Sequence, residues 1–198
     1  MKCKAKRPFE PSLRAEVALG PAYHSFQRLT GQETLACGMA GLCESLILFA
    51  PETRNAQLAY RGRTEQRLVP WGPGLSYHVA RNVLAMSGLR VFGEPCSRLL
   101  EPLLGQHAAT RIASDLLCNM AVSALSTPLH MAYTWKATNL QDTKGFKEIL
   151  RHQWLENGRL RPTVGRDVIL RVAYNASIFT LYGAVERTVM TLWPRLFG

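Results

Sequence analysis

The chain has 198 residues, and its 24 Lys and Arg side chains outnumber its 14 Asp and Glu side chains, which gives a formal net charge of +10. Apolar residues make up 47% of the sequence and charged residues 19%, so the chain is too apolar and too weakly charged to be disordered. Five cysteines form no C-x-x-C pair and stand near no histidine cluster, which argues against a disulfide framework and against a zinc module. The basic N-terminus leads into Pro8, Glu10 and Pro11 rather than into an apolar run, so no secretory signal is expected.

The first apolar stretch covers residues 34–51, TLACGMAGLCESLILFAP, and carries a single charge, Glu44. About 18 residues is near the lower limit for crossing a bilayer, and an extension beyond Pro51 would complete the span. Its small residues, Ala36, Gly38, Ala40 and Gly41, would let a neighbouring helix approach closely. A buried helix of a soluble bundle is the alternative interpretation.

Three further apolar stretches follow. Residues 75–100 come after the chain-breaking PWGPG segment and carry His78, Arg81 and Arg90, so hydropathy alone does not predict a span there. Residues 112–135 contain one formally charged residue, Asp115, and are long enough to cross a bilayer. After a basic segment, residues 167–193 are again largely apolar.

The chain also shows an internal repeat. Each half contains an apolar helix that is expected to end at a proline, Pro51 or Pro128, followed by a basic loop, a glycine and a helix that bears an arginine, Arg81 or Arg171. Residues 34–105 and 106–198 are therefore predicted to be two copies of one unit, although coincidence would explain parts of the alignment.

This order of elements, with Gly-x6-Arg at the start of the second helix, resembles the mitochondrial carrier family. The resemblance covers about residues 34–198 and corresponds to the second and third of the family's three repeats. Residues 144–150 look like its short matrix-side helix, and residues 168–173 look like the start of its sixth helix. The resemblance implies an all-α transmembrane bundle of two carrier-like repeats with about four spanning helices, incomplete relative to the six-helix carrier barrel, in the mitochondrial inner membrane. Residues 1–33 would then be a polar N-terminal segment that keeps at most a remnant of a preceding helix.

The charged gate motifs of the family are eroded in this sequence. The motif P-x-[DE]-x-x-[KR] is displaced after Pro51, where Glu52 and Arg54 stand, and it has neither charge after Pro128. The motif [FY]-[DE]-x-x-[KR] keeps only Glu94 in the first repeat, and no gate charge stands in register in the second. Gating by paired charges in the family's form is therefore not expected.

Ionisable residues on spanning helices predict a functional site, because such residues are costly in lipid unless they face protein, water or a partner. Glu44, Arg81, Asp115 and Arg171 meet this description. Arg81 with Asn82 would suit a carboxylate or similar anion, since the guanidinium is a planar donor fork and the amide adds a donor; Arg171 shares a helix face with Asn175. The family resemblance implies that Arg81, Asn82, Arg171 and Asn175 bind substrate. The alternative is that the arginines pair with Glu44 or Asp115 inside the bundle, or extend to the membrane surface.

No phosphate-binding loop, nucleophile elbow or metal-spaced Cys/His set occurs in the sequence, so no enzyme activity, cofactor or metal is expected. No basic patch interleaved with aromatics indicates a nucleic-acid partner.

These observations lead to two functional hypotheses. The first hypothesis is alternating-access transport of an anionic metabolite, with a homo-oligomer or another membrane protein completing the open barrel. The second is a non-transporting structural or assembly subunit of a mitochondrial membrane complex. The basic segments between spans suit an anionic lipid surface such as one rich in cardiolipin. A soluble cationic helical protein is the third interpretation.

Overall fold

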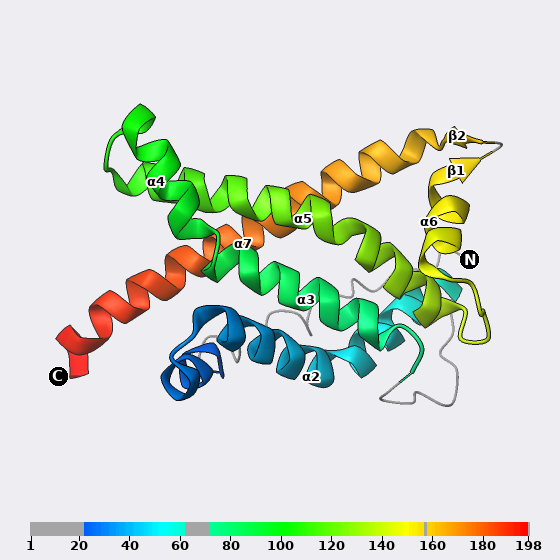
Figure 1. Cartoon of the computed structure of the whole chain (residues 1–198), viewed down its shortest axis with the longest axis horizontal. Helices are drawn as coiled ribbons and strands as arrows, with labels where there is room; N and C mark the ends of the chain where they lie inside the picture. The colour runs from blue at the N-terminus through cyan, green and yellow to red at the C-terminus, as the bar shows by residue number, and fades with distance from the viewer. Residues whose placement is uncertain (1–21, 62–71, 157, 198) are drawn as a thin grey trace, which may run out of the picture.

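The computed structural model describes residues 22–61, 72–156 and 158–197, and these residues are mostly helical (Figure 1). After a short helical segment at residues 22–30, the helices are α2 (Glu33–Arg61), α3 (Leu75–Arg90), α4 (Gly93–Leu104), α5 (Ala108–Thr138), α6 (Phe146–Trp154) and α7 (Pro162–Phe197). A two-stranded antiparallel hairpin, β1 (Leu155–Glu156) with β2 (Arg159–Leu160), joins α6 to α7. The predicted all-α class is confirmed.

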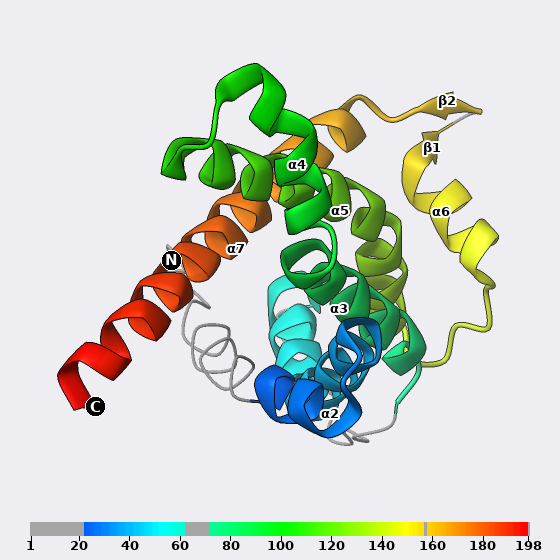
Figure 2. The same ribbon diagram turned by 60° about the vertical axis from the view of Figure 1, so that its left-hand side comes forward.

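Four helices form the body of the molecule. α2 packs on α3, α3 on α5 and α5 on α7, and smaller contacts join α2 to α5 and α3 to α7. Figures 1 and 2 show α7 crossing α5 obliquely, with α4 at one end of the bundle and α6 with the hairpin at the other. The largest buried side chains lie between α2 and α5, where Phe49 and Tyr133 pack together.

Three helical stretches within the described residues are long and apolar enough to cross a membrane. They are Glu33–Tyr60, Ala108–Thr138 and Pro162–Val189. Their outer faces expose large apolar side chains, as on α2 at Ile47, on α5 at Leu125 and on α7 at Leu181, and extended apolar surface of this kind is typical of a membrane-facing protein. α3 has only 16 residues, or about 24 Å at 1.5 Å per residue, which is less than the thickness of the hydrocarbon core. Of the four spans that the sequence predicts, three are therefore long and apolar enough to cross a membrane.

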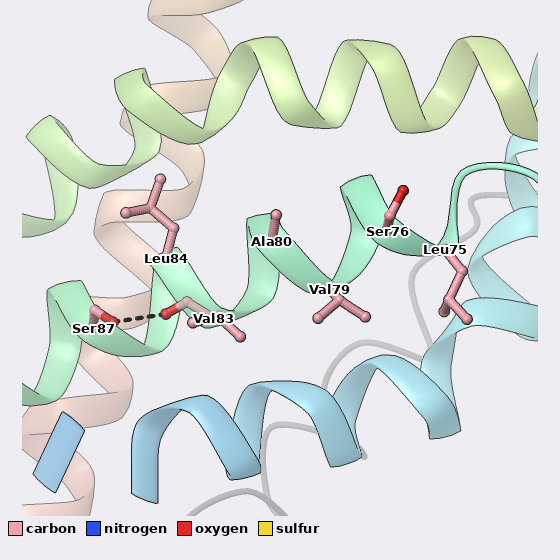
Figure 3. A pocket seen from close by; sticks show the side chains of 7 residues that line it. All are labelled: Leu75, Ser76, Val79, Ala80, Val83, Leu84 and Ser87. Atoms are coloured by element: carbon pink, nitrogen blue, oxygen red, sulfur yellow. Dashed lines mark hydrogen bonds between the residues drawn. The ribbon is translucent and has the colours of Figure 1, made fainter. Parts of the chain in front are cut away.

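α3 also bears an open apolar groove (Figure 3), on its face between α2 and α5. Ser87 lines the groove, and its hydroxyl donates to the main-chain carbonyl of Val83 at 2.9 Å. This bond satisfies the hydroxyl within the helix, so the groove presents mainly aliphatic surface. Its lining residues are Leu75, Ser76, Val79, Ala80, Val83, Leu84 and Ser87.

The prediction that helices end at Pro51 and Pro128 is wrong. Both prolines lie inside helices, since α2 continues to Arg61 and α5 to Thr138. A proline removes one main-chain hydrogen bond, and helices tolerate this where nearby groups satisfy the freed carbonyls. In the turn before Pro128, the hydroxyls of Ser126 and Thr127 both donate to the Ser123 carbonyl, at 3.1 and 2.8 Å, one residue before the Ala124 carbonyl that would have accepted from residue 128.

The apolar stretch at residues 75–100 is divided rather than continuous. α3 ends at Arg90, where the main-chain N–H groups of Val91 and Phe92 both donate to Ser87 O, and α4 begins at Gly93. Pro95 has no N–H with which to continue the helical ladder across this point. α5 contacts the start of α4 at this point, because Ser114 Oγ donates to Gly93 O at 3.1 Å and Cys118 Sγ lies 3.3 Å from Phe92 O, which also accepts from the Cys96 main-chain N–H.

Candidate functional site

A chamber of about 140 Å³ lies between α2, α3, α5 and α7. The four residues predicted to bind substrate line it together, Arg81 and Asn82 from α3 and Arg171 and Asn175 from α7. Glu44 of α2 lines it as well. The structure therefore brings these five sequence-predicted residues to one cavity in the interior of the bundle.

Arg81 is held by a network of neighbours. Its Nη2 donates to both carboxylate oxygens of Glu52, at 2.9 and 3.2 Å, and its Nε donates to Asn82 Oδ1 at 2.8 Å. Its Nη1 donates to His130 Nδ1 at 3.2 Å, and its guanidinium lies 5.4 Å from the centre of the Tyr133 ring. The positive charge of Arg81 is thus matched by Glu52. The ion-pair partner is neither Glu44 nor Asp115, the two that the sequence suggested.

The same network reaches deeper into the bundle through His78. The His78 side chain is fully buried, and its Nε2 lies 3.2 Å from Glu52 Oε2. Asn82 Nδ2 donates to Ser45 Oγ of α2 at 3.2 Å. These contacts orient Glu52 and Arg81 and fix α3 against α2.

Arg171 is in a different situation. Its Nε is buried without a hydrogen-bond partner, and no carboxylate of a described residue lies within 4.0 Å of its guanidinium. A buried, unpaired cation is costly in a protein interior or in lipid. Since guanidinium binds carboxylate and phosphate with paired hydrogen bonds, Arg171 can receive an anion in the chamber.

Asp115 lies outside the chamber, toward the α4 end of the bundle. Its carboxylate accepts a 2.6 Å hydrogen bond from Arg187 of α7. Close by along α7, Glu186 accepts from Arg90 of α3 at 2.6 Å and lies 3.2 Å from His24. Asp115 is therefore a buried charge partner, as predicted, and its partner is Arg187 rather than an arginine of the chamber.

Sequence reasoning missed two residues of the network, Glu52 and His130. Glu52 directly follows Pro51, and His130 comes two residues after Pro128. Residues just after the two prolines thus both contact Arg81, although they stand one residue out of register with each other. A comparison of the residues after each proline as polar side chains rather than as gate charges would have given this signal.

A second, larger cleft of about 540 Å³ lies between α5, α6 and the start of α7. Arg171 lines both cavities, and His130, which lines the cleft, lies with its Nδ1 3.2 Å from Nη1 of Arg81, which lines the chamber. The two cavities therefore meet at Arg171. Within the described part of the chain, no group of three or more His, Cys, Asp or Glu side chains is arranged to hold a metal ion.

Comparison with protein-family models, with curated proteins and with solved structures gives no match for this chain. The arguments for its function therefore come from the residues and the geometry described above.

Proposed function

We propose that this protein is a carrier-like integral membrane protein that moves a small anionic metabolite across the mitochondrial inner membrane by alternating access. The observation that carries the proposal is the position of Arg171, a partly buried cation whose Nε has no hydrogen-bond partner and which has no carboxylate of a described residue within 4.0 Å, in a chamber between four helices. Such a group is expected to bind the charge of a solute, because the anion replaces the water that the guanidinium has lost.

The size of the chamber limits the solute. About 140 Å³ corresponds to roughly five water molecules at about 30 Å³ each. A short carboxylate or a phosphate fits this space, whereas a nucleotide does not. Arg81 and Asn82 would position such a solute from α3, while the carboxylate of Glu52 compensates most of the positive charge of Arg81.

The internal repeat supports the transport mechanism. The two units pair α2 with α3 and α5 with α7, and the chamber lies between them. Rocking of one unit against the other would expose Arg171 to each side in turn. Because four helices leave the carrier-like barrel open between α2 and α7, a second copy or another membrane protein would close it. The net charge of +10 suits the anionic, cardiolipin-rich lipid of that membrane.

Uptake by reconstituted liposomes tests this function. The full chain is placed in vesicles containing cardiolipin, and uptake of radiolabelled succinate, citrate and phosphate is measured for the parent chain and for Arg171→Ala and Arg81→Ala. We expect saturable uptake of at least one anion, lost in Arg171→Ala and reduced in Arg81→Ala. Arg151→Ala is the control, since Arg151 is exposed on α6. Flux that is unchanged in Arg171→Ala would overturn the proposal.

A non-transporting structural or assembly subunit is the second candidate. Three ion pairs join different helices, Glu52 with Arg81, Glu186 with Arg90 and Asp115 with Arg187, and they would hold the bundle in one conformation. This candidate is favoured if the parent chain stays in the membrane on carbonate extraction and co-purifies with a larger membrane complex, yet takes up none of the three anions. Release into the carbonate supernatant would contradict both candidates.

A further inference from the structure

The cleft between α5, α6 and the start of α7 contains a second arginine of the same kind as Arg171. Arg161 stands between β2 and α7, lines the cleft, and its Nε is buried without a hydrogen-bond partner. Its main-chain N–H donates to Trp154 O at 2.8 Å, which fixes the backbone from which the side chain extends. No carboxylate of a described residue lies within 4.0 Å of the Arg161 guanidinium.

Several other polar groups of the cleft already have partners. Thr138 Oγ1 and Asn139 Nδ2 donate to carbonyls of α5 at 2.8 and 3.0 Å, and Gln153 Nε2 donates to Met131 O at 3.4 Å. Asp167 is the acidic residue that lines the cleft, and its carboxylate lies 3.3 Å from the exposed Arg166. The cleft therefore contains two guanidinium groups whose Nε atoms are buried without a hydrogen-bond partner, beside Thr138, Asn139 and Gln153 side chains that donate to main-chain carbonyls.

We propose that this cleft is an anion-binding site, in which Arg161 and Arg171 together hold a small soluble anion that carries at least two negative charges. This inference rests on the proposed function and names the substrate class. A singly charged anion would leave one of the two guanidinium charges of the cleft uncompensated, whereas two negative charges compensate both. The cleft, at about 540 Å³, has room for the anion with part of its hydration water.

The position of the cleft gives it a place in the path of the solute. Arg171 lines both the cleft and the chamber. An anion bound between Arg161 and Arg171 can therefore leave Arg161 and move toward Arg81 and Asn82 in the chamber while it stays in contact with Arg171. Arg161 thus acts in capture on the α6 side of the bundle, and Arg171 acts in both positions.

Anion-dependent stabilisation of the purified full chain tests the site. The thermal unfolding midpoint is measured in detergent at constant ionic strength with increasing citrate, succinate or acetate, for the parent chain, Arg161→Gln, Arg171→Gln and Arg159→Gln. Arg159 is exposed on β2, two residues from Arg161 and outside the cleft lining, so Arg159→Gln removes the same charge without removing a site residue. We expect a saturable stabilisation by citrate or succinate, an apparent Kd at least tenfold higher in Arg161→Gln and in Arg171→Gln, and a parental Kd in Arg159→Gln.

Three results would overturn the site. They are equal Kd values in Arg161→Gln and Arg159→Gln, a stabilisation by acetate equal to that by citrate, and a response seen with cardiolipin-containing micelles but with none of the soluble anions, which would identify a lipid headgroup instead. The test is independent of transport. If citrate binds through Arg161 while liposomes take up no anion, the transport proposal fails and the site stands; if uptake depends on Arg171 but not on Arg161, the cleft site fails and transport stands.

Discussion

Arg81 of α3 and Glu52 of α2 form an ion pair across the interior of the bundle, with Arg81 Nη2 2.9 Å from Glu52 Oε2. The pair lies beside Arg171, which has no carboxylate of a described residue within 4.0 Å, so two arginines that line one chamber differ in how far their charge is compensated. Glu52 thereby leaves Arg171 as the main cationic group available to a solute.

A double-mutant cycle on Glu52→Gln and Arg81→Gln measures this pair. Each single substitution leaves a partly buried ion without its oppositely charged partner in this pair, whereas the double variant removes both charges, so we expect the double variant to be more stable than the sum of the single effects predicts. The coupling is expected to be about 0.5 to 3 kcal/mol, read from unfolding in detergent. Strictly additive effects would show that the two groups do not interact. Glu52→Gln should also tighten anion binding, since it frees the charge of Arg81.

The ion pair between Asp115 and Arg187 is predicted to fix α5 against α7. Asp115→Arg places two cations together and should lower the unfolding midpoint, and the reciprocal double variant Asp115→Arg with Arg187→Asp should recover part of the loss. The exposed pair Arg98–Glu94 on α4 is the control, because such i,i+4 pairs contribute about 0.3 to 0.5 kcal/mol, and Arg98→Gln should change the midpoint little. No recovery in the double variant would mean that the Asp115 to Arg187 contact does not stabilise the fold.

Much of the fold follows from local sequence, because apolar stretches predict buried or membrane-facing helices directly. Residues 34–51 and 112–135 lie in α2 and α5, and residues 167–193 lie in α7. The helix ends were less predictable. Pro51 and Pro128 indicate stops by their chemistry, yet α2 and α5 continue, because packing between helices outweighs the loss of one main-chain hydrogen bond at each proline.

The site was predictable in its members and less so in its pairing. Arg81 and Arg171 were singled out because ionisable residues in apolar helices are costly and therefore informative, and the family resemblance implied Asn82 and Asn175 beside them. Which carboxylate pairs with Arg81 depends on how α2 rotates against α3, a tertiary property that spacing along one helix does not determine. Arg161 gave no signal at all, since it lies in a segment rich in arginine where a single basic residue does not stand out.

Asp142 is predicted to control the loop between α5 and α6 as a function of pH. The main-chain N–H of Lys144 donates to Asp142 Oδ1 at 2.8 Å, and the indole N–H of Trp135 donates to Oδ2 at 2.6 Å. The Lys144 N–H first, and then the indole and the Lys144 ammonium, lower the pKa of the Asp142 carboxyl below its ordinary value of 3.8, against a smaller opposing effect of burial. The stabilisation is therefore complete above that value and is lost as the pH falls through the lower pKa of the folded state.

Fluorescence of Trp135, in a variant that keeps only this tryptophan, measures the loss of these bonds. The emission maximum should be constant from pH 7 to about pH 4.5 and shift to the red in stronger acid. Asp142→Asn should be shifted already at pH 7 and be insensitive to acid, while Asp167→Asn, a control on the exposed start of α7, should behave as the parent does. An acid response that is identical in Asp142→Asn and the parent would assign it to another group.

Two glycines set the distance between helices, and a third provides their control. A Cβ at Gly41 would lie 2.8 Å from Val83 Cα, and a Cβ at Gly88 would lie 2.8 Å from Val122 Cγ2, whereas a Cβ at Gly38 would meet no heavy atom within 4 Å. Alanine is the better helix former by about 1 kcal/mol, but a clash with main chain or with a stiff β-branched side chain costs about 1 to 3 kcal/mol. Gly41→Ala and Gly88→Ala should therefore lower the unfolding midpoint, and Gly38→Ala should leave it unchanged or raise it. If all three variants shift in the same direction and by the same amount, helix propensity alone explains the result, and α2 does not approach α3 as closely as Gly41 and Val83 require.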